Sequence, residues 1–278
     1  MREDSLDTDT AWELWGARDP YFGVLTDARF RASSMTAEDK EVFFASGRQH
    51  VDLVLDSLRK HVDASLAPQR ILDFGCGVGR VVIPFARIAA DVVGMDISPS
   101  MLAEARSNCA EGGATNVTLL RSDDLLSTLE GTFDLVHSCI VLQHIEVPRG
   151  TALFAQLVRR IRPGGVGAIH VTFGWTIYAA TYGQPVAPPP PPPPTRAQLL
   201  KRWIRKWLYP EREASPPKPA QPESDPEMQM NYYNLSELMF ILHRAGVQQV
   251  HTEMTDHGGA LGAFLFFRIP PAPTPGGG

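Results

Sequence analysis

Residues 71–80 have the sequence ILDFGCGVGR, and this stretch decides the fold of the chain. Its apolar first half predicts a short buried strand over residues 70–74. Gly75, Gly77 and Gly79 follow, and they permit a tight turn because glycine adopts backbone conformations that other residues avoid. Residues 78–89 then have the apolar spacing of a helix. A strand that runs through a glycine-rich turn into a helix predicts an α/β unit, and the free N–H groups at the start of that helix can face a ligand.

The same alternation of strand and helix continues along the chain. Further strands are predicted at residues 91–95, 117–121, 133–138 and 166–172. Helices are predicted at residues 99–111 and 149–161, with the sequence RPGG at 162–165 expected to stop the second. A helix over 235–245 and two neighbouring antiparallel strands over 247–254 and 261–269 complete the pattern. Such alternation predicts a parallel sheet with helices on both faces.

Composition and pattern divide the chain into five segments. They are an N-terminal arm with a helical cap (1–65), the α/β core (66–173), a proline-rich insertion (174–230), a C-terminal helix with the last two strands of the core (231–270) and a tail expected to be disordered (271–278). Within the first segment, residues 36–39 resemble a helix capping box. The arm before them is expected to be irregular or partly helical, and its aromatic residues either pack on the core or form a lid over a ligand. These aromatic residues are Trp12, Trp15, Tyr21 and Phe22.

The length, composition and net charge of the chain limit the class of protein. The 278 residues are 44% hydrophobic, enough to form a buried core, and a formal net charge of −5 gives no long-range attraction to nucleic acid. The three cysteines, Cys76, Cys109 and Cys139, do not suggest a disulfide framework, and they favour a reducing, cytoplasmic location. No CxxC or Cys/His cluster predicts a metal site. The acidic first fifteen residues lack the apolar segment of a signal peptide, and no run is long and apolar enough to predict a membrane span.

Acidic residues beside the glycine turn restrict the ligand. Asp73 lies at the end of the first strand, and Asp96 ends the second. A carboxylate in the second position can accept hydrogen bonds from both ribose hydroxyls, although Asp96 could instead cap the following helix. A dinucleotide fingerprint, GxGxxG, would need glycine where Arg80 stands. Because Asp73 would repel a pyrophosphate and attract an ammonium or sulfonium, the charges favour S-adenosylmethionine over a dinucleotide.

These motifs resemble those of the class I S-adenosylmethionine-dependent methyltransferases, especially the small-molecule type. The resemblance covers roughly residues 70–173 and, more weakly, 232–269. The segments that resemble the family's successive motifs are residues 72–79, 92–102, 119–125 and 133–138. The resemblance implies a Rossmann-like seven-stranded mixed sheet in the order 3-2-1-4-5-7-6, sandwiched by helices. It also implies an N-terminal helical region that covers the cofactor, S-adenosyl-L-methionine.

The resemblance assigns roles to individual residues. Asp96 would hold the ribose, and Ile97 and Met101 would flank the adenine. Asp123 would accept a hydrogen bond from the adenine amino group, unless it and Asp124 form only a solvated turn. The full set of predicted cofactor-binding residues is Asp73, Gly75, Cys76, Gly77, Gly79, Asp96, Ile97, Met101, Ser122, Asp123, Asp124 and Ser138.

The predicted catalytic residue is His144. In methyl transfer the cofactor supplies the electrophile, and the protein mainly positions the reactants. His144 follows the fourth strand, and a neutral imidazole there could take a proton from the acceptor; alternatively, the ring only holds its loop in place. The fourth motif lacks the Asn/Asp-Pro-Pro-Tyr/Phe sequence of enzymes that methylate nitrogens of bases or glutamine. This favours a small-molecule acceptor, attacked at oxygen, nitrogen or carbon, and no nucleic-acid partner is expected.

Two alternative functions stay open from the residues alone. One is a non-catalytic nucleoside-binding or interaction protein, and the other is a methyltransferase that acts on a macromolecule or a lipid-linked substrate. The insertion bears on both, because residues 196–209 predict a helix with one basic face and one face of tryptophan, leucine and isoleucine. Such a helix could be a lid, contact an anionic membrane, bind a protein or pack on its own domain. The sequence assigns no oligomeric state.

Overall fold

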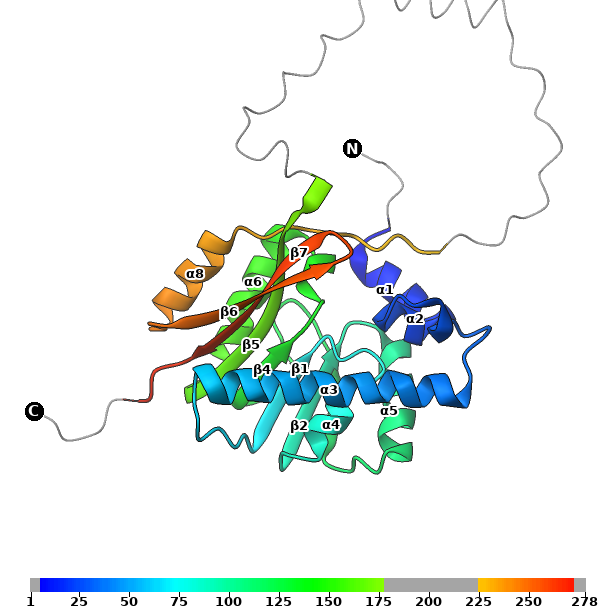
Figure 1. Cartoon of the computed structure of the whole chain (residues 1–278), viewed down its shortest axis with the longest axis horizontal. Coiled ribbons are helices and arrows are strands. Elements are labelled where there is room, and N and C mark those ends of the chain that lie inside the picture. The colour runs from blue at the N-terminus through cyan, green and yellow to red at the C-terminus, as the bar shows by residue number, and fades with distance from the viewer. Residues whose placement is uncertain (1–5, 178–224, 273–278) are drawn as a thin grey trace, which may run out of the picture. The chain divides into compact units, whose positions relative to one another are not determined.

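The computed structural model describes residues 6–177 and 225–272, which contain a seven-stranded sheet (Figure 1). The predicted order 3-2-1-4-5-7-6 is confirmed. β1 to β5 are parallel, whereas β7 is antiparallel to both β5 and β6. The strands are β1 (Arg70–Phe74), β2 (Asp91–Asp96), β3 (Val117–Arg121), β4 (Phe133–Ser138), β5 (Ile161–Trp175), β6 (Val250–His257) and β7 (Ala260–Arg268).

Helices cover the sheet and its carboxyl edge (Figure 1). The α-helices are α1 (Thr8–Arg18), α2 (Pro20–Val24), α3 (Ala37–His61), α4 (Val82–Ala86), α5 (Pro99–Glu111), α6 (Val147–Arg159) and α8 (Leu235–Arg244). Two short 3-10 helices are η1 (Ala28–Phe30) and η2 (Leu142–His144). The predicted helix at 196–209 lies outside the described residues. No helix in the described ranges is long and apolar enough to cross a membrane.

Two apolar layers hold the sheet between the helices. One contains side chains of α6 and α8, among them Phe154 and Leu238, and the other contains side chains of α3, α4 and α5, among them Leu58 and Phe85. All four of these side chains are fully buried. Burial on both faces explains why the central strands are nearly continuous apolar runs.

From residue 6 onward, the N-terminal arm packs on the core. Trp15, Tyr21 and Phe22 join a third apolar cluster around the fully buried Phe43 of α3. The predicted capping box is present at the start of α3: the Asp39 N–H donates to Thr36 Oγ1 at 3.2 Å, and the Thr36 N–H donates to Asp39 Oδ2 at 2.9 Å. The arm and α3 therefore form one layer beside the glycine turn.

The first predicted helix of the core is much shorter than expected. We expected it over residues 78–89, but α4 spans only Val82–Ala86. The backbone still turns through Gly79, whose φ is +86°, so the helix cannot begin before that residue. The Arg87 N–H then donates to the Pro84 carbonyl in a tighter, 3-10-type bond that ends the helix.

The fifth strand is longer than expected at both ends. We expected residues 162–165 to form a turn before a strand over 166–172, but Ile161 already pairs with Phe133 of β4. An irregularity in the register accommodates the intervening residues before Val166 pairs with Leu135. At its other end β5 continues to Trp175, which pairs with Ala260 of β7.

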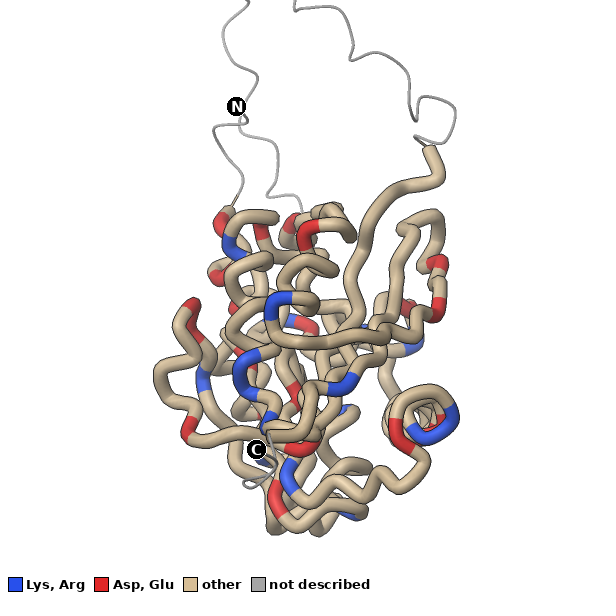
Figure 2. The backbone as a smooth tube through the Cα atoms, turned by 90° about the vertical axis from the view of Figure 1, so that its left-hand side faces the viewer, with Lys and Arg blue, Asp and Glu red and all other residues tan. Residues whose placement is uncertain are grey.

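Charged residues of both signs are interspersed along the described chain in the view of Figure 2. Several form ion pairs that join distant elements. Arg70 of β1 pairs with Asp91 of β2 at 2.7 Å, and Lys40 of α3 pairs with Glu111 of α5 at 2.9 Å. These pairs are partly exposed to solvent, so each contributes little to stability.

Candidate functional site

A pocket of about 500 Å³ opens at the carboxyl ends of β1, β2 and β4. Open α/β sheets bind ligands at this edge, where the strand order changes direction between β1 and β4. The other walls come from α1, α2, η2 and the segment 228–230, which returns from the insertion. A pocket of this volume suits a small organic molecule.

The glycine turn forms the floor of this pocket and depends on its glycines. The φ angles of Gly75 and Gly77 are +78° and +51°, in the region that favours glycine. A Cβ at Gly75 would lie 2.2 Å from Val141 Cγ2, and one at Gly77 would lie 2.6 Å from Val24 Cγ2. Both valines line the pocket. The glycines therefore bring the backbone of the turn directly against the walls of the site.

Asp96, at the end of β2, is held by the same turn. Its Oδ2 accepts from the Gly77 N–H and its Oδ1 accepts from the Ser98 N–H, both at 2.9 Å. Each oxygen keeps a further lone pair, so the carboxylate can still accept from two ligand hydroxyls. Burial raises the pKa of Asp96 to about 6, and the nearby Asp73 contributes to this rise. The helix cap on α5 itself comes from Ser98 Oγ, which accepts from the Met101 N–H at 3.1 Å.

Helix α1 is fastened over one side of the pocket. Arg149 of α6 pairs with both Asp9 oxygens, at 2.7 and 3.0 Å, and with Asp124 at 2.6 Å. Thr8 Oγ1 donates to the carbonyl of His144 at 2.5 Å. Asp9, Asp124 and Arg149 all line the pocket. These bonds tie the arm to the loops after β3 and β4, so the arm acts as a wall of the site.

His144 lies in the pocket wall as a neutral imidazole. Its Nδ1 is 2.8 Å from the Gln229 carbonyl, so Nδ1 carries the proton and Nε2 is an acceptor. The Gln143 amide nitrogen lies 3.3 Å from that Nε2, and Thr172 Oγ1 donates to Gln143 Oε1 at 2.8 Å, which orients the amide. Burial lowers the pKa of His144 to about 4. The ring of Trp12 packs edge-on against His144 at 4.9 Å. These surroundings are compatible with both interpretations of His144: a base that takes the acceptor's proton, and a ring that only holds its loop in place.

Asp73 and Arg80 both line the pocket, and their opposite charges interact. Asp73 accepts through Oδ1 from Nδ1 of His137 at 2.7 Å, and Nε2 of His137 lies 2.9 Å from Nε2 of His50. Arg80 lines the same pocket, and its Nε is buried without a hydrogen-bond partner among the described residues, while its Nη1 reaches only Ser46 Oγ at 3.4 Å. A carboxylate and a guanidinium so placed can receive the ammonium and carboxylate of an amino acid.

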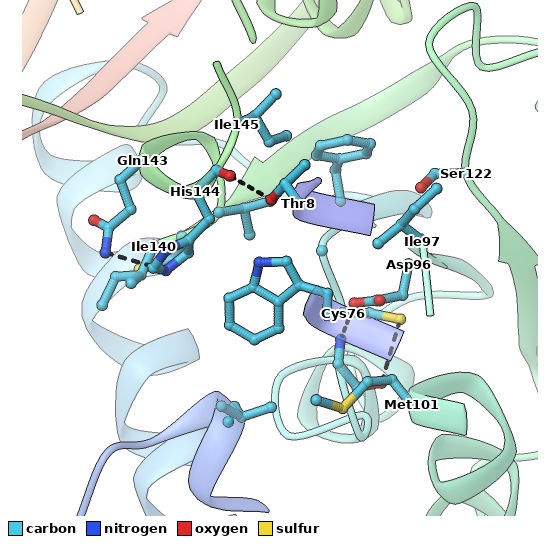
Figure 3. Close-up of a pocket in the computed structure, with 18 of the residues that line it drawn as sticks. Thr8, Cys76, Asp96, Ile97, Met101, Ser122, Ile140, Gln143, His144 and Ile145 are labelled. Atoms are coloured by element: carbon cyan, nitrogen blue, oxygen red, sulfur yellow. Dashed lines mark hydrogen bonds between the residues drawn. The ribbon is translucent and has the colours of Figure 1, made fainter. Parts of the chain in front are cut away.

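All the predicted site residues line this pocket except Gly79 and Ser138. Figure 3 shows Asp96, Ile97 and Ser122 on one side, with Gln143 and His144 opposite. A Cβ at Gly79 would meet Ala105, so this position serves the turn and its packing. Ser138 Oγ is buried and has no partner within the described ranges. The assignment of all the predicted residues to a cofactor stays a prediction.

Asp123 is engaged within its own turn. Its Oδ1 accepts from the N–H groups of Leu125 and Ser127, at 3.0 and 2.9 Å. The hydroxyl of Ser127 also donates to it, and this bond is the main reason that the pKa of the carboxyl is lowered, followed by the bond from the Ser127 N–H. These bonds match the solvated-turn alternative, and binding of a ligand amino group would have to use a remaining lone pair.

Sequence reasoning missed several residues of the pocket. Arg80 and Gln143 directly adjoin predicted residues, so adjacency could have suggested them. Arg149, by contrast, offers no local signal, because its partner Asp9 lies far away in the chain. In the part of the chain that the structure describes, no group of three or more His, Cys, Asp or Glu side chains could hold a metal ion.

Comparison with protein families matches residues 71–165 to the model described as "Methyltransferase domain". This segment is therefore similar to methyltransferase domains. An uncharacterized methyltransferase of Synechocystis is 36% identical over 101 residues, which are 36% of this chain and 46% of that protein. A ubiquinone biosynthesis O-methyltransferase of Nitrosococcus oceani is 33% identical over 114 residues, 41% of this chain and 47% of that protein. The chain thus spans about half the length of the curated relatives it matches.

Solved structures share the fold of this chain over its described residues. Magnesium protoporphyrin IX methyltransferase from Synechocystis, with bound S-adenosylmethionine, matches 96% of this chain and 99% of its own with a TM-score of 0.56 at 20% identity. An N-methyltransferase from Bradyrhizobium japonicum, with bound S-adenosylhomocysteine, matches 95% of this chain and 100% of its own with a TM-score of 0.53 at 16% identity. At these identities the likeness concerns the fold alone.

Proposed function

We propose that this chain is an S-adenosylmethionine-dependent methyltransferase with a small-molecule acceptor. The observation that carries the proposal is that one pocket at the carboxyl edge of the methyltransferase domain brings together Asp73, Asp96 and His144. Two of these are carboxylates on either side of a glycine turn, and the third is a neutral imidazole. This arrangement suits a nucleoside with a cationic tail on one side and an acceptor on the other.

The residues present fit the proposed cofactor. Asp96 would accept from the two ribose hydroxyls, while Ile97 and Met101 would contact the adenine. The amino acid end would lie between Asp73 and Arg80. The buried, unpartnered Nε of Arg80 supports this, because a buried guanidinium without an acceptor is costly and a ligand carboxylate would satisfy it.

When bound, S-adenosylmethionine supplies a methyl group on a sulfonium that a nucleophile can attack directly. His144 would accept the acceptor's proton at Nε2, displacing the long contact with Gln143. Although a pKa of about 4 makes His144 a weak base, the acceptor's proton becomes far more acidic as the new bond forms, so a weak base suffices. The arm, held by Arg149, would keep water from the reacting atoms.

The named relatives support a small acceptor, since the matches include ubiquinone biosynthesis O-methyltransferases. Oxygen, nitrogen and carbon acceptors are each compatible with this pocket. A cytoplasmic location is part of the same proposal, and the three free cysteines, of which Cys76 and Cys109 are buried, support it.

The experiment that tests the proposal is calorimetric titration of the full chain with S-adenosylhomocysteine, beside an Asp96→Ala variant and NAD. We expect binding of S-adenosylhomocysteine that the variant greatly weakens, and no binding of NAD. Transfer of a labelled methyl group to members of an acceptor panel then tests turnover. Binding of NAD, or equal binding of S-adenosylhomocysteine by both proteins, would overturn the proposal. Tight binding without transfer to any small molecule would favour a nucleoside-binding protein.

A further inference from the structure

Three titratable side chains from three elements form a hydrogen-bonded row that ends in the pocket. Asp73 belongs to β1, His137 to the adjacent β4, and His50 to α3. The Asp73 Oδ1 to His137 Nδ1 distance is 2.7 Å, and the distance between the two histidine Nε2 atoms is 2.9 Å. The side chains of His137 and Asp73 are only 1% and 4% exposed. Burying polar groups costs desolvation free energy, so a continuous buried row of them suggests a functional role.

The direction of the hydrogen bond to Asp73 follows from the chemistry of its carboxylate. Burial, with help from the neighbouring His137 and Arg80, lowers the pKa of His50 to about 2, so this ring is neutral and has one N–H. An ionised Asp73 can only accept, so His137 donates to it through Nδ1–H. The second hydrogen bond of the row joins Nε2 of His137 to Nε2 of His50. The row therefore presents one N–H donor, that of His137, to Oδ1 of Asp73.

The row leaves one oxygen of Asp73 for a ligand. Oδ1 is taken by His137, and Oδ2 makes no hydrogen bond within the described residues, although Asp73 lines the pocket. The histidine rings themselves cannot easily turn away. Phe264 of β7 stacks on His50 at 5.9 Å, and Phe264 and Phe85 pack edge-on against His137 at 6.0 and 5.4 Å.

We propose that His137, supported by His50, is a positioning residue that aims Oδ2 of Asp73 at the amino group of the cofactor's methionine tail. This inference rests on the function proposed above. A carboxylate held by one fixed N–H donor needs no reorientation when the ammonium arrives, and the bond it then forms is charge-assisted. Without the donor, the carboxylate would be free to turn toward Arg80, whose positive charge interacts with it in the same pocket.

Other ionisable groups surround the row, and none replaces the donor. Asp96 and the thiol of Cys76 lie on the glycine-turn side, where both feel the charge of Asp73. Cys139 lies beyond β4, near Asp73 and Arg80. His170 of β5 packs edge-on against Phe264 at 6.0 Å, and its own Nε2 is bonded to Thr255 Oγ1 at 2.8 Å. His137 is therefore the only described side chain that donates to Asp73.

The test compares two ligands that differ only in the tail. S-adenosylhomocysteine carries the amino acid, whereas 5′-methylthioadenosine has the same thio-nucleoside without it. We would measure both dissociation constants for the intact chain and for His137→Leu, His137→Asn and His50→Leu. Asparagine can place its amide N–H where Nδ1–H stood, but leucine cannot. His243→Leu, on the exposed surface of α8, serves as the matched control.

We expect His137→Leu to weaken S-adenosylhomocysteine about tenfold or more, as expected for a lost bond to a charged group, with methylthioadenosine unchanged. His137→Asn should recover most of this loss, and His50→Leu should show a smaller effect of the same kind. Equal loss for both ligands would mean a merely structural role, and no loss for either would mean that the row does not position Asp73; either result overturns the inference. Failure of the intact chain to bind S-adenosylhomocysteine would instead overturn the proposed function itself.

Discussion

The ionisation of Asp96 predicts that cofactor affinity and protein stability change in opposite directions with pH. The two ribose hydroxyls donate to this carboxylate in the proposed complex, and a charged acceptor forms the stronger bonds. Burial raises its pKa from 3.8 to about 6. The carboxyl is therefore mostly ionised at pH 7 and mostly protonated at pH 5. We expect the affinity for S-adenosylhomocysteine to fall as the pH is lowered through this window.

The magnitude follows from the fraction ionised. With a pKa of about 6, roughly nine-tenths of the Asp96 carboxyl is ionised at pH 7 and roughly one-tenth at pH 5. The dissociation constant should thus rise about tenfold, which corresponds to about 1.4 kcal/mol. His144 does not add to this change, because its pKa of about 4 keeps it neutral over the same range.

The free protein should behave in the opposite way. Because the folded-state pKa of Asp96 exceeds the unfolded value, the folded state binds more protons between the two. The contribution of Asp96 to stability is therefore greatest at low pH and is lost as the pH rises through about 6. Relative to an Asp96→Asn variant, the free energy of unfolding should increase by about 1.3 kcal/mol between pH 7 and pH 5.

Calorimetric titration at pH 7, 6 and 5 measures the affinity, and urea unfolding at the same pH values measures the stability. The Asp96→Asn variant is the control, because it cannot ionise and its amide oxygen can still accept from one of the two N–H groups, of Gly77 or Ser98, that donate to the carboxylate oxygens. Its affinity should be weaker at pH 7 and nearly independent of pH. An affinity of the intact chain that does not change with pH, or the same change in the variant, would refute the reasoning.

Three further predictions concern the turn, the base and the arm. Gly75→Ala should lower the free energy of unfolding in urea by more than about 1–2 kcal/mol, because the added Cβ would lie only 2.2 Å from Val141. Gly113→Ala is the control: its φ is also positive, at +67°, but no atom lies within 4 Å of the added Cβ, so this variant should show only the cost of the left-handed backbone. His144→Ala should lower kcat about 100-fold or more in a methyl-transfer assay while the KM for S-adenosylmethionine stays nearly constant, and equal effects on both would contradict a role as base. Arg149→Met should release α1 and raise the dissociation rate of S-adenosylhomocysteine several-fold in stopped flow, whereas an unchanged rate would show that the arm does not hold the ligand.

Much of the fold could be predicted because its signals are local. The strand over 70–74, the helix over 99–111 and the strands over 117–121 and 133–138 match the predicted boundaries. Each has apolar residues at the period of its own backbone, and the first two are followed directly by Gly75 and Gly112, so neighbouring residues largely define these elements. The strand order came from resemblance to a family, since local periodicity does not say which strands pair.

The three errors had different physical causes. The sequence RPGG is a good helix stop and turn, yet Ile161 pairs with Phe133, so the strand begins before it. The helix predicted from residue 78 begins only at Val82, because Gly77 and Gly79 both hold the chain in a left-handed turn. The return of residues 228–230 to the pocket wall could not be foreseen, because it depends on where the chain re-enters after the insertion.

The sequence by itself determined the α/β alternation, the glycine turn and the position of Asp96 at the end of a strand. These follow from backbone preferences and burial, which short stretches encode. Only the tertiary structure decided that His50 and His137 stand behind Asp73, that Arg149 fastens α1, and that Gln229 sets the tautomer of His144. A hydrogen bond needs its two partners within about 3 Å, and for residues far apart in the chain that distance depends on how all the intervening elements pack.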